Sequence, residues 1–284
     1  MQELPKYKII FLILSSDKYP SPINEKKQKK TWVKYAKNSG NKVIFYKGGT
    51  HELLDEDYLY VNSGDGLYDI GYKTIDALKW VKKNYDFEYV VRSNSSTYIN
   101  VKEIEKFIES LDLNTPIYAG RSTSFNNQFN YVHGSCIILN SLAVMNIIEN
   151  EEHWDHRLID DAALGKLFDL NKIKVLDKDI FHVGSELLRK EFNKNQIAYR
   201  CKMELAGYPR YLDKFFIQLV HDFLSNKNSS LKVFFYRVVF NVIKIFNFKY
   251  YYLRYIPRIY YKLLSFLPNK FKKYIKKLIT NLKF

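Results

Sequence analysis

The chain has 284 residues, in which short apolar runs alternate with longer segments that carry apolar residues at helical spacing. The apolar, β-rich runs predict strands at residues 7–16, 42–46, 58–61, 88–91, 116–119, 135–139 and 174–176. Helical spacing predicts helices at residues 25–37, 72–84, 101–111, 141–149 and 159–168. Strands that alternate with helices form βαβ units, so the pattern predicts an α/β fold with a mostly parallel sheet.

The stretch Phe87–Asn100 is the most informative part of this pattern. Its apolar run is typical of a strand buried on both faces, and it breaks into the small polar residues 93–96 before resuming as Thr97–Asn100. Open α/β sheets bind ligands beyond the carboxyl ends of their strands, so these polar side chains are candidates for a binding site. The alternative is an ordinary polar loop between a strand and a helix.

Composition bounds the architecture. With 46% apolar residues the chain can bury a sizeable core, and we expect one α/β domain over residues 1–215 followed by an appendage. The two cysteines, Cys136 and Cys201, have neither CxxC nor metal-binding spacing, which fits buried thiols in a reducing compartment. The N-terminal apolar core Ile9–Leu14 is too short for a membrane span or a signal peptide, and is interpreted as the first buried strand.

Charge is placed unevenly along the chain. The formal net charge is +15, yet residues 223–284 contain fourteen Lys or Arg and no Asp or Glu, which leaves the preceding part almost neutral. Basic segments rich in Phe and Tyr lie on anionic membrane surfaces, where each cation adds on the order of 1 kcal/mol. Interleaved aromatic and basic residues also suit single-stranded nucleic acid. We favour the membrane surface for this tail over nucleic acid.

Several separated motifs resemble glycosyltransferase family 31, the β1,3-glycosyltransferases that include Fringe. They occur in the family's order and span about residues 28–185. The matching elements are Lys30-Thr31-Trp32, Asp65…Asp69…Lys73-Thr74…Trp80, Arg92–Asn100, Tyr118-Ala119-Gly120, His133-Gly134…Leu139-Asn140-Ser141, Ile159-Asp160-Asp161…Gly165 and Phe181-His182. The resemblance implies a GT-A-type fold and inverting transfer of a sugar from a nucleotide-diphosphate donor, such as a UDP-sugar.

The resemblance also implies roles for particular residues. The residues placed at the acceptor are His133 and Gly134, and those placed at the donor are Asp65, Asp69, Lys73, Arg92, Asn94, Ser95, Ser96 and His182.

The family's metal-binding aspartate cluster is replaced here by Asn94-Ser95-Ser96. Hard divalent cations such as Mn²⁺ prefer charged oxygen ligands, so we expect no firmly held metal and no required cofactor. Cations of the protein would then neutralise the diphosphate, since arginine binds phosphate oxygens bidentately. The candidates are Lys73, Arg92, Arg121, Arg189 and Arg200. His182, whose counterpart in the Fringe branch completes the metal site, would bind a phosphate or be an ordinary loop histidine.

Asp160 and Asp161 are the candidate catalytic carboxylates. Inverting transfer needs one carboxylate to take the proton of the attacking hydroxyl, and Asp161 matches the family's base position. Paired aspartates can also raise one another's pKa. The alternative is a helix N-terminus, where aspartate is favoured by the helix dipole and by free backbone N–H groups.

These observations lead to one hypothesis and one alternative. The hypothesis is a transferase that works on a lipid-linked glycan of a surface polysaccharide or glycolipid, in the cytoplasm and peripherally on the inner face of the cell membrane. The alternative is a catalytically inactive glycan- or lipid-binding protein of the same fold.

Overall fold

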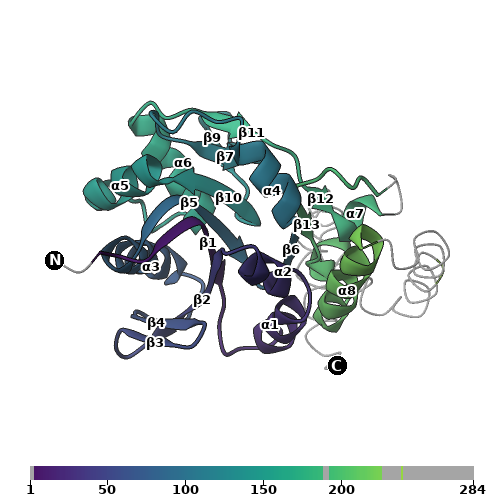
Figure 1. Cartoon of the computed structure of the whole chain (residues 1–284). Coiled ribbons are helices and arrows are strands. Elements are labelled where there is room, and N and C mark those ends of the chain that lie inside the picture. The colour runs from purple at the N-terminus through teal and green to yellow at the C-terminus, as the bar shows by residue number, and fades with distance from the viewer. Residues whose placement is uncertain (1–2, 188–191, 226–237, 239–284) are drawn as a thin grey trace, which may run out of the picture.

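The computed structural model describes residues 3–187, 192–225 and 238 (Figure 1). Its centre is an eight-stranded mixed sheet in the order β11-β7-β10-β5-β1-β2-β4-β3. The strands of this sheet are β1 (Lys6–Leu14), β2 (Lys42–Gly49), β3 (Leu53–Asp55), β4 (Tyr58–Asn62), β5 (Asp86–Asn94), β7 (Tyr118–Gly120), β10 (Cys136–Asn140) and β11 (Val175–Asp177). Neighbours among β4, β2, β1 and β5 are parallel, whereas β10 is antiparallel to both β5 and β7. The predicted α/β fold with a mostly parallel central sheet is confirmed.

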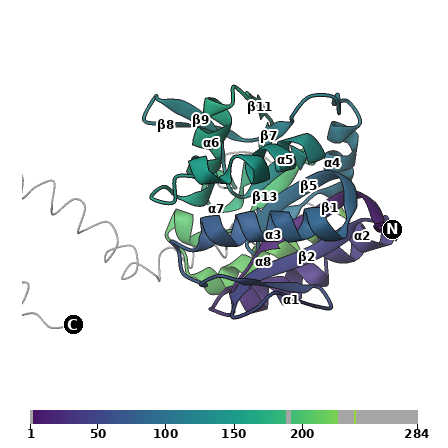
Figure 2. The same cartoon turned by 90° about the vertical axis from the view of Figure 1, so that its left-hand side faces the viewer.

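Helices cover both faces of this sheet. Along β1, Ile9, Phe11 and Ile13 pack into one core, while Ile10 and Leu12 pack into the other. Burial on both faces explains why the strand is a continuous apolar run. One face carries α1 (Ser21–Lys29), α2 (Trp32–Asn38), α4 (Val101–Ile108) and α8 (Asp213–Leu224). The other carries α3 (Ile70–Asn84), α5 (Ser141–Glu149) and α6 (Asp160–Leu170), which lie in front of the strands in Figure 2.

The strand order places a crevice at the ends of β1 and β5. From β1 the chain moves outward to β2 and β4, then returns to form β5 on the opposite side of β1. Leu14 and Asn94, the last residues of these two strands, are register partners. Connections that leave adjacent parallel strands in opposite directions open a crevice at their carboxyl ends, where ligands bind in such sheets.

Smaller elements surround this crevice. A second sheet joins β12 (Phe181–His182), β13 (Ala198–Arg200) and β6 (Thr97–Ile99), and a hairpin joins β8 (Ser122–Phe125) to β9 (Phe129–Val132). The short helices are α7 (Val183–Glu186), η1 (Glu151–His153), η2 (Met203–Ala206) and η3 (Arg210–Leu212). The prediction that the strand near residue 175 is the last one was wrong, because β12 and β13 are too short to produce a sequence signal.

Two predicted boundaries differ from the structure. The single helix expected over residues 25–37 is divided at Thr31, whose hydroxyl donates to the carbonyl oxygens of Lys27 (2.9 Å) and Gln28 (3.2 Å). A threonine that bonds to the preceding turn in this way competes with the helical backbone. The strand expected to end at Val91 continues to Asn94. Arg92 and Ser93 pair with both β1 and β10, and Asn94 pairs with β1.

The helix α8 bears on the extent of the domain. The predicted boundary at residue 215 falls within α8, whose residues Phe216, Ile217, Leu219 and Val220 are buried in the core. The predicted basic tail therefore begins on a packed helix, and beyond Ser225 it lies outside the described residues except at Val238. In the part of the chain that the structure describes, no helix has the length and apolar character needed to cross a membrane.

Gln28 links α1 to the end of β5, and its removal gives a first prediction. Its Nε2 donates to the carbonyl oxygens of Asn94 (3.2 Å) and Thr97 (2.6 Å). We expect Gln28→Met, which keeps the volume and removes both bonds, to lower the free energy of unfolding by about 1–3 kcal/mol. Chemical denaturation measures this, with the exposed Lys26→Met as the matched control. Equal stability of the two variants would contradict the prediction.

Candidate active site

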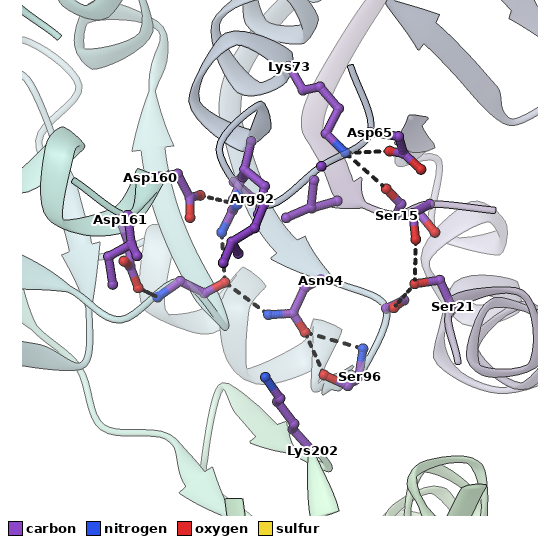
Figure 3. Close-up of a pocket in the computed structure, with 18 of the residues that line it drawn as sticks. Ser15, Ser21, Asp65, Lys73, Arg92, Asn94, Ser96, Asp160, Asp161 and Lys202 are labelled. Carbon is purple, nitrogen blue, oxygen red and sulfur yellow. Dashed lines mark hydrogen bonds and ion pairs between the residues drawn. The ribbon is translucent and has the colours of Figure 1, made fainter. Parts of the chain in front are cut away.

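A cavity of about 490 Å³ lies at the carboxyl ends of β1 and β5 (Figure 3). Polar and charged side chains from both halves of the chain dominate its lining. They are Ser15, Ser16, Ser21, Asp65, Lys73, Arg92, Asn94, Ser95, Ser96, His133, Asp160, Asp161, Arg200, Lys202 and Arg210. Gly134 also lines the cavity. Ten of the predicted site residues therefore meet in one place, whereas Asp69 and His182 lie outside the lining.

Asn94 closes the turn that follows β5. Its Oδ1 accepts from Ser96 N (3.2 Å), Ser96 Oγ (3.0 Å) and Thr97 Oγ1 (3.1 Å), and its Nδ2 donates to Gly134 O (3.1 Å). Ser95 Oγ donates to Ser21 Oγ at 3.2 Å. The turn is thus held by its own side chains and joined to the first residue of α1.

The residues at this turn do not fit a divalent cation. The only side-chain oxygen of Asn94 already accepts three hydrogen bonds, and the neighbouring serines offer neutral hydroxyls where a hard cation prefers carboxylates. Within residues 3–187, 192–225 and 238, no three or more His, Cys, Asp or Glu side chains are grouped so that they could hold a metal ion.

Asp65 and Lys73 form one wall of the cavity. The buried Lys73 Nζ lies 2.6 Å from Asp65 Oδ1, which also accepts from the Gly48 N–H at 3.3 Å. Asp69 instead accepts from the Gly66 N–H at 2.8 Å and so fixes the loop that carries Asp65. Asp69 therefore shapes the wall of the cavity without lining it.

Arg92 forms the floor between β5 and α6. Each nitrogen of its guanidinium has a partner: Nε donates to Tyr46 Oη (3.1 Å), Nη1 donates to Gly134 O (2.8 Å), and Nη2 pairs with Asp160. The positive charge of the buried Arg92 is therefore matched by Asp160 before any ligand binds.

Asp161 is the carboxylate that faces the cavity without a cationic partner among the described residues. It lies in the first turn of α6, as the helix N-terminus interpretation predicts, and accepts from the backbone N–H groups of Ala162 (3.0 Å) and Gly134 (2.8 Å). Burial, and next the charge of Asp160, raise the pKa of Asp161 above its ordinary value, against the effect of these bonds. A Cβ at Gly134 would lie 2.9 Å from Asp161 Oδ2 and 3.0 Å from Arg92 Nη1, so a side chain there would displace the Asp161 carboxylate.

Two histidines lie beside Asp161's end of the cavity. The His133 and His182 rings are 5.2 Å apart, and burial together with nearby arginines lowers the pKa of His133 to about 3 and that of His182 to about 4. Both rings are therefore neutral at physiological pH. His133 Nδ1 lies 2.8 Å from Ser135 Oγ and 3.4 Å from Ser135 N, which hold the orientation of the ring.

Arg200, Lys202 and Arg210 form the wall opposite Lys73. Arg200 lies on β13, and its buried Nε and Nη1 have no hydrogen-bond partner among the described residues. Burial lowers the pKa of Arg200 to about 10, with Asp161 acting in the opposite sense. Lys202 is directed toward Asn94 in Figure 3, and Arg210 pairs with the buried Asp213.

These contacts separate the predicted cations by their freedom to bind an anion. Arg92 and Lys73 are paired, and Arg121 lies near Asp179 (3.7 Å) and Glu186 (3.8 Å) and does not line the cavity. Arg189 lies outside the described residues. Among the predicted cations that the structure describes, Arg200 lines the cavity with unused donors. An unpaired buried guanidinium group costs stability unless an anion binds to it, so Arg200 is the candidate that binds an anion.

Sequence reasoning did not select several lining residues. Ser15 and Ser16 follow the first buried strand just as Ser95 and Ser96 follow β5, so the rule for strand ends could have identified them. Lys202 and Arg210 reach the cavity because β13 pairs with β6, about one hundred residues earlier in the chain, and no local pattern announces such a contact.

No family model matches the chain. Among solved structures, it is similar to one titled "Crystal structure of a glycosyltransferase involved in the glycosylation of the major capsid of PBCV-1". The identity is 14%, the match covers 75% of this chain and 100% of that one, and the TM-score is 0.49. The similarity is distant.

The raised pKa of Asp161 predicts a pH-dependent stability. The folded state holds this proton more tightly than the unfolded chain, so stability falls as the pH rises from the ordinary aspartate pKa through the raised value. Asp161→Asn removes this loss of stability. We therefore expect the thermal midpoint of the variant to increase relative to that of wild type as the pH rises. Asp169→Asn, at the exposed end of α6, is the control. A variant equally destabilised at every pH would contradict this.

Proposed function

We propose that the protein is a glycosyltransferase that moves a sugar from a nucleoside-diphosphate donor, such as a UDP-sugar, to a hydroxyl of an acceptor glycan without a metal. The observation that carries the proposal is the shared crevice of Asp161 and Arg200: a half-buried carboxylate with a raised pKa and an arginine whose buried Nε and Nη1 have unused donors line the same cavity. Perturbed carboxyl groups in a cleft mark sites of proton transfer.

The donor would lie along the crevice. Its volume of about 490 Å³ is in the range of small-molecule sites. In the proposal, the hydroxyls of Ser15, Ser16 and Ser21 and the carboxylate of Asp65 meet the nucleoside. The diphosphate meets Arg200 and its neighbours Lys202 and Arg210, beside the turn Asn94–Ser96. Charge-assisted bonds from an arginine suit phosphate oxygens and supply the neutralisation that a metal would otherwise give.

Asp161 would act as the general base. As the acceptor oxygen forms its bond to the anomeric carbon, its proton passes to Asp161. The bond between that carbon and the phosphate oxygen breaks, and its electron pair leaves with the nucleoside diphosphate. Arg200 stabilises the charge that develops on this leaving group. Asp160 keeps Arg92 neutralised and, through its own charge, raises the basicity of Asp161.

The finer parts of the proposal come from the resemblance and the charge pattern. We infer an inverting transfer of the β1,3 type, with His133 and Gly134 beside the acceptor. The fourteen Lys and Arg of residues 223–284 would hold the enzyme on an anionic membrane, peripherally and on its cytoplasmic face. A lipid-linked acceptor in polysaccharide or glycolipid synthesis would then be within reach.

Asp161→Asn tests the catalytic assignment. We expect transfer, measured as release of nucleoside diphosphate in the presence of acceptor, to fall by about 10²–10⁴-fold because no base takes the proton. Donor affinity should stay within about twofold, since the change leaves the phosphate-binding wall intact. Unchanged transfer would refute the base. Donor binding without transfer by the wild type would favour the inactive binding protein.

Arg200→Met tests the metal-free donor site. We expect the dissociation constant for UDP, measured by calorimetry with excess chelator, to rise by about tenfold to a hundredfold as charged hydrogen bonds are lost. Arg121→Met is the matched control, because Arg121 is already near two carboxylates. Wild-type binding that appears only with added Mn²⁺ would overturn the metal-free donor site.

A further inference from the structure

A rim of apolar and aromatic residues lies beside the cavity, on α3, the loop before it and the segment that leads into α6. We define the rim as Leu67, Tyr68, Tyr72, His156 and Ile159. Leu67 and Ile159 line the cavity and are 69% and 55% exposed, so they reach from its interior to the surface. Tyr68 and Tyr72 are 82% and 50% exposed. Exposed apolar groups gathered beside a polar cavity mark a binding surface.

Two separate segments of the chain meet in the rim. The rings of Tyr72 and His156 are stacked with centroids 3.6 Å apart and planes 5° apart. A Cβ at Gly71 would lie 2.7 Å from Trp154 Nε1 and 3.1 Å from His156 Nδ1, so the start of α3 packs against the segment before α6 without an intervening side chain. A ring fixed in this way loses little conformational freedom when a ligand stacks on it.

The charge of the rim segments limits what can bind there. Residues 64–72 and 154–161 contain five aspartates, one arginine and no lysine. Asp65, Asp155 and Asp160 are paired with cations, and the single arginine, Arg157, is one of these cations. The rim segments therefore offer an anionic membrane no unpaired cation. Tyrosine combines an apolar ring face with a polar hydroxyl, and a neutral pyranose combines an apolar C–H face with hydroxyls. Tyrosine rings beside carboxylates therefore match a neutral sugar in both respects.

We propose that this rim is the acceptor subsite, where Tyr72 and Tyr68 stack a neutral hexose of the acceptor glycan and so present its hydroxyl to Asp161. The assignment rests on the proposed function, since it places the acceptor next to the proposed base. Ile159 lies one residue before the Asp160–Asp161 pair, so a sugar on the rim lies at the same end of the cavity as the carboxylate.

Saturation-transfer NMR of the full chain tests the rim with neutral disaccharides, namely lactose, cellobiose and chitobiose, in the presence of UDP. We expect ring-proton signals from at least one disaccharide with wild type, and a loss of about tenfold in its affinity in Tyr72→Ala and in Tyr68→Ala. Tyr72→Phe, which keeps the ring, should bind within about twofold of wild type. Tyr35→Ala, an exposed tyrosine on α2, is the matched control and should bind as wild type does.

The outcomes separate this inference from the proposed function. Disaccharide binding that survives in both tyrosine-to-alanine variants, or no binding of any of the three by wild type, would overturn the rim. A rim-dependent attachment to vesicles of anionic phospholipid would overturn it in favour of a membrane surface. The affinity of UDP, measured by calorimetry on the same samples, tests the donor site alone. Folding of each variant is checked by its thermal midpoint.

Discussion

The ion pair between Arg92 and Asp160 is the interaction on which the site depends. It joins the end of β5 to the first turn of α6, and the same guanidinium also bonds Gly134 O and Tyr46 Oη. Three elements distant in the sequence are thereby fixed around one buried charge. Breaking such a pair leaves an uncompensated charge in the core, so the geometry of Asp161 is tied to the stability of the fold.

Around this fixed centre, the molecule keeps two groups in states that do not favour folding. Asp161 holds a proton more tightly than an ordinary aspartate, and Arg200 has buried donors with no partner among the described residues. Groups of this kind cost stability in the empty protein and become useful only when a ligand supplies the opposite charge or takes part in proton transfer. Their presence in one crevice is easier to explain by substrate binding than by folding.

The sequence predicted the regular secondary structure of the central sheet and its helices well. Buried strands and amphipathic helices reveal themselves by local periodicity, and the crevice follows from where those strands end. The features that the sequence did not predict depend on long-range pairing. The second sheet and the wall formed by Lys202 and Arg210 depend on contacts between segments far apart in the chain. Thr31 divides a helix through a side-chain bond that periodicity does not register.

The turn at Asn94 has an evolutionary consequence. Oδ1 of Asn94 accepts from Ser96 and Thr97, and its Nδ2 donates to Gly134 O, so a single Asn-to-Asp change would lose that donor and set a carboxylate oxygen against the carbonyl. A cation would need further acidic residues at Ser95 or Ser96, both buried, and each alone would add an unpaired charge. Each single substitution toward a metal site at this turn is therefore costly before it is useful.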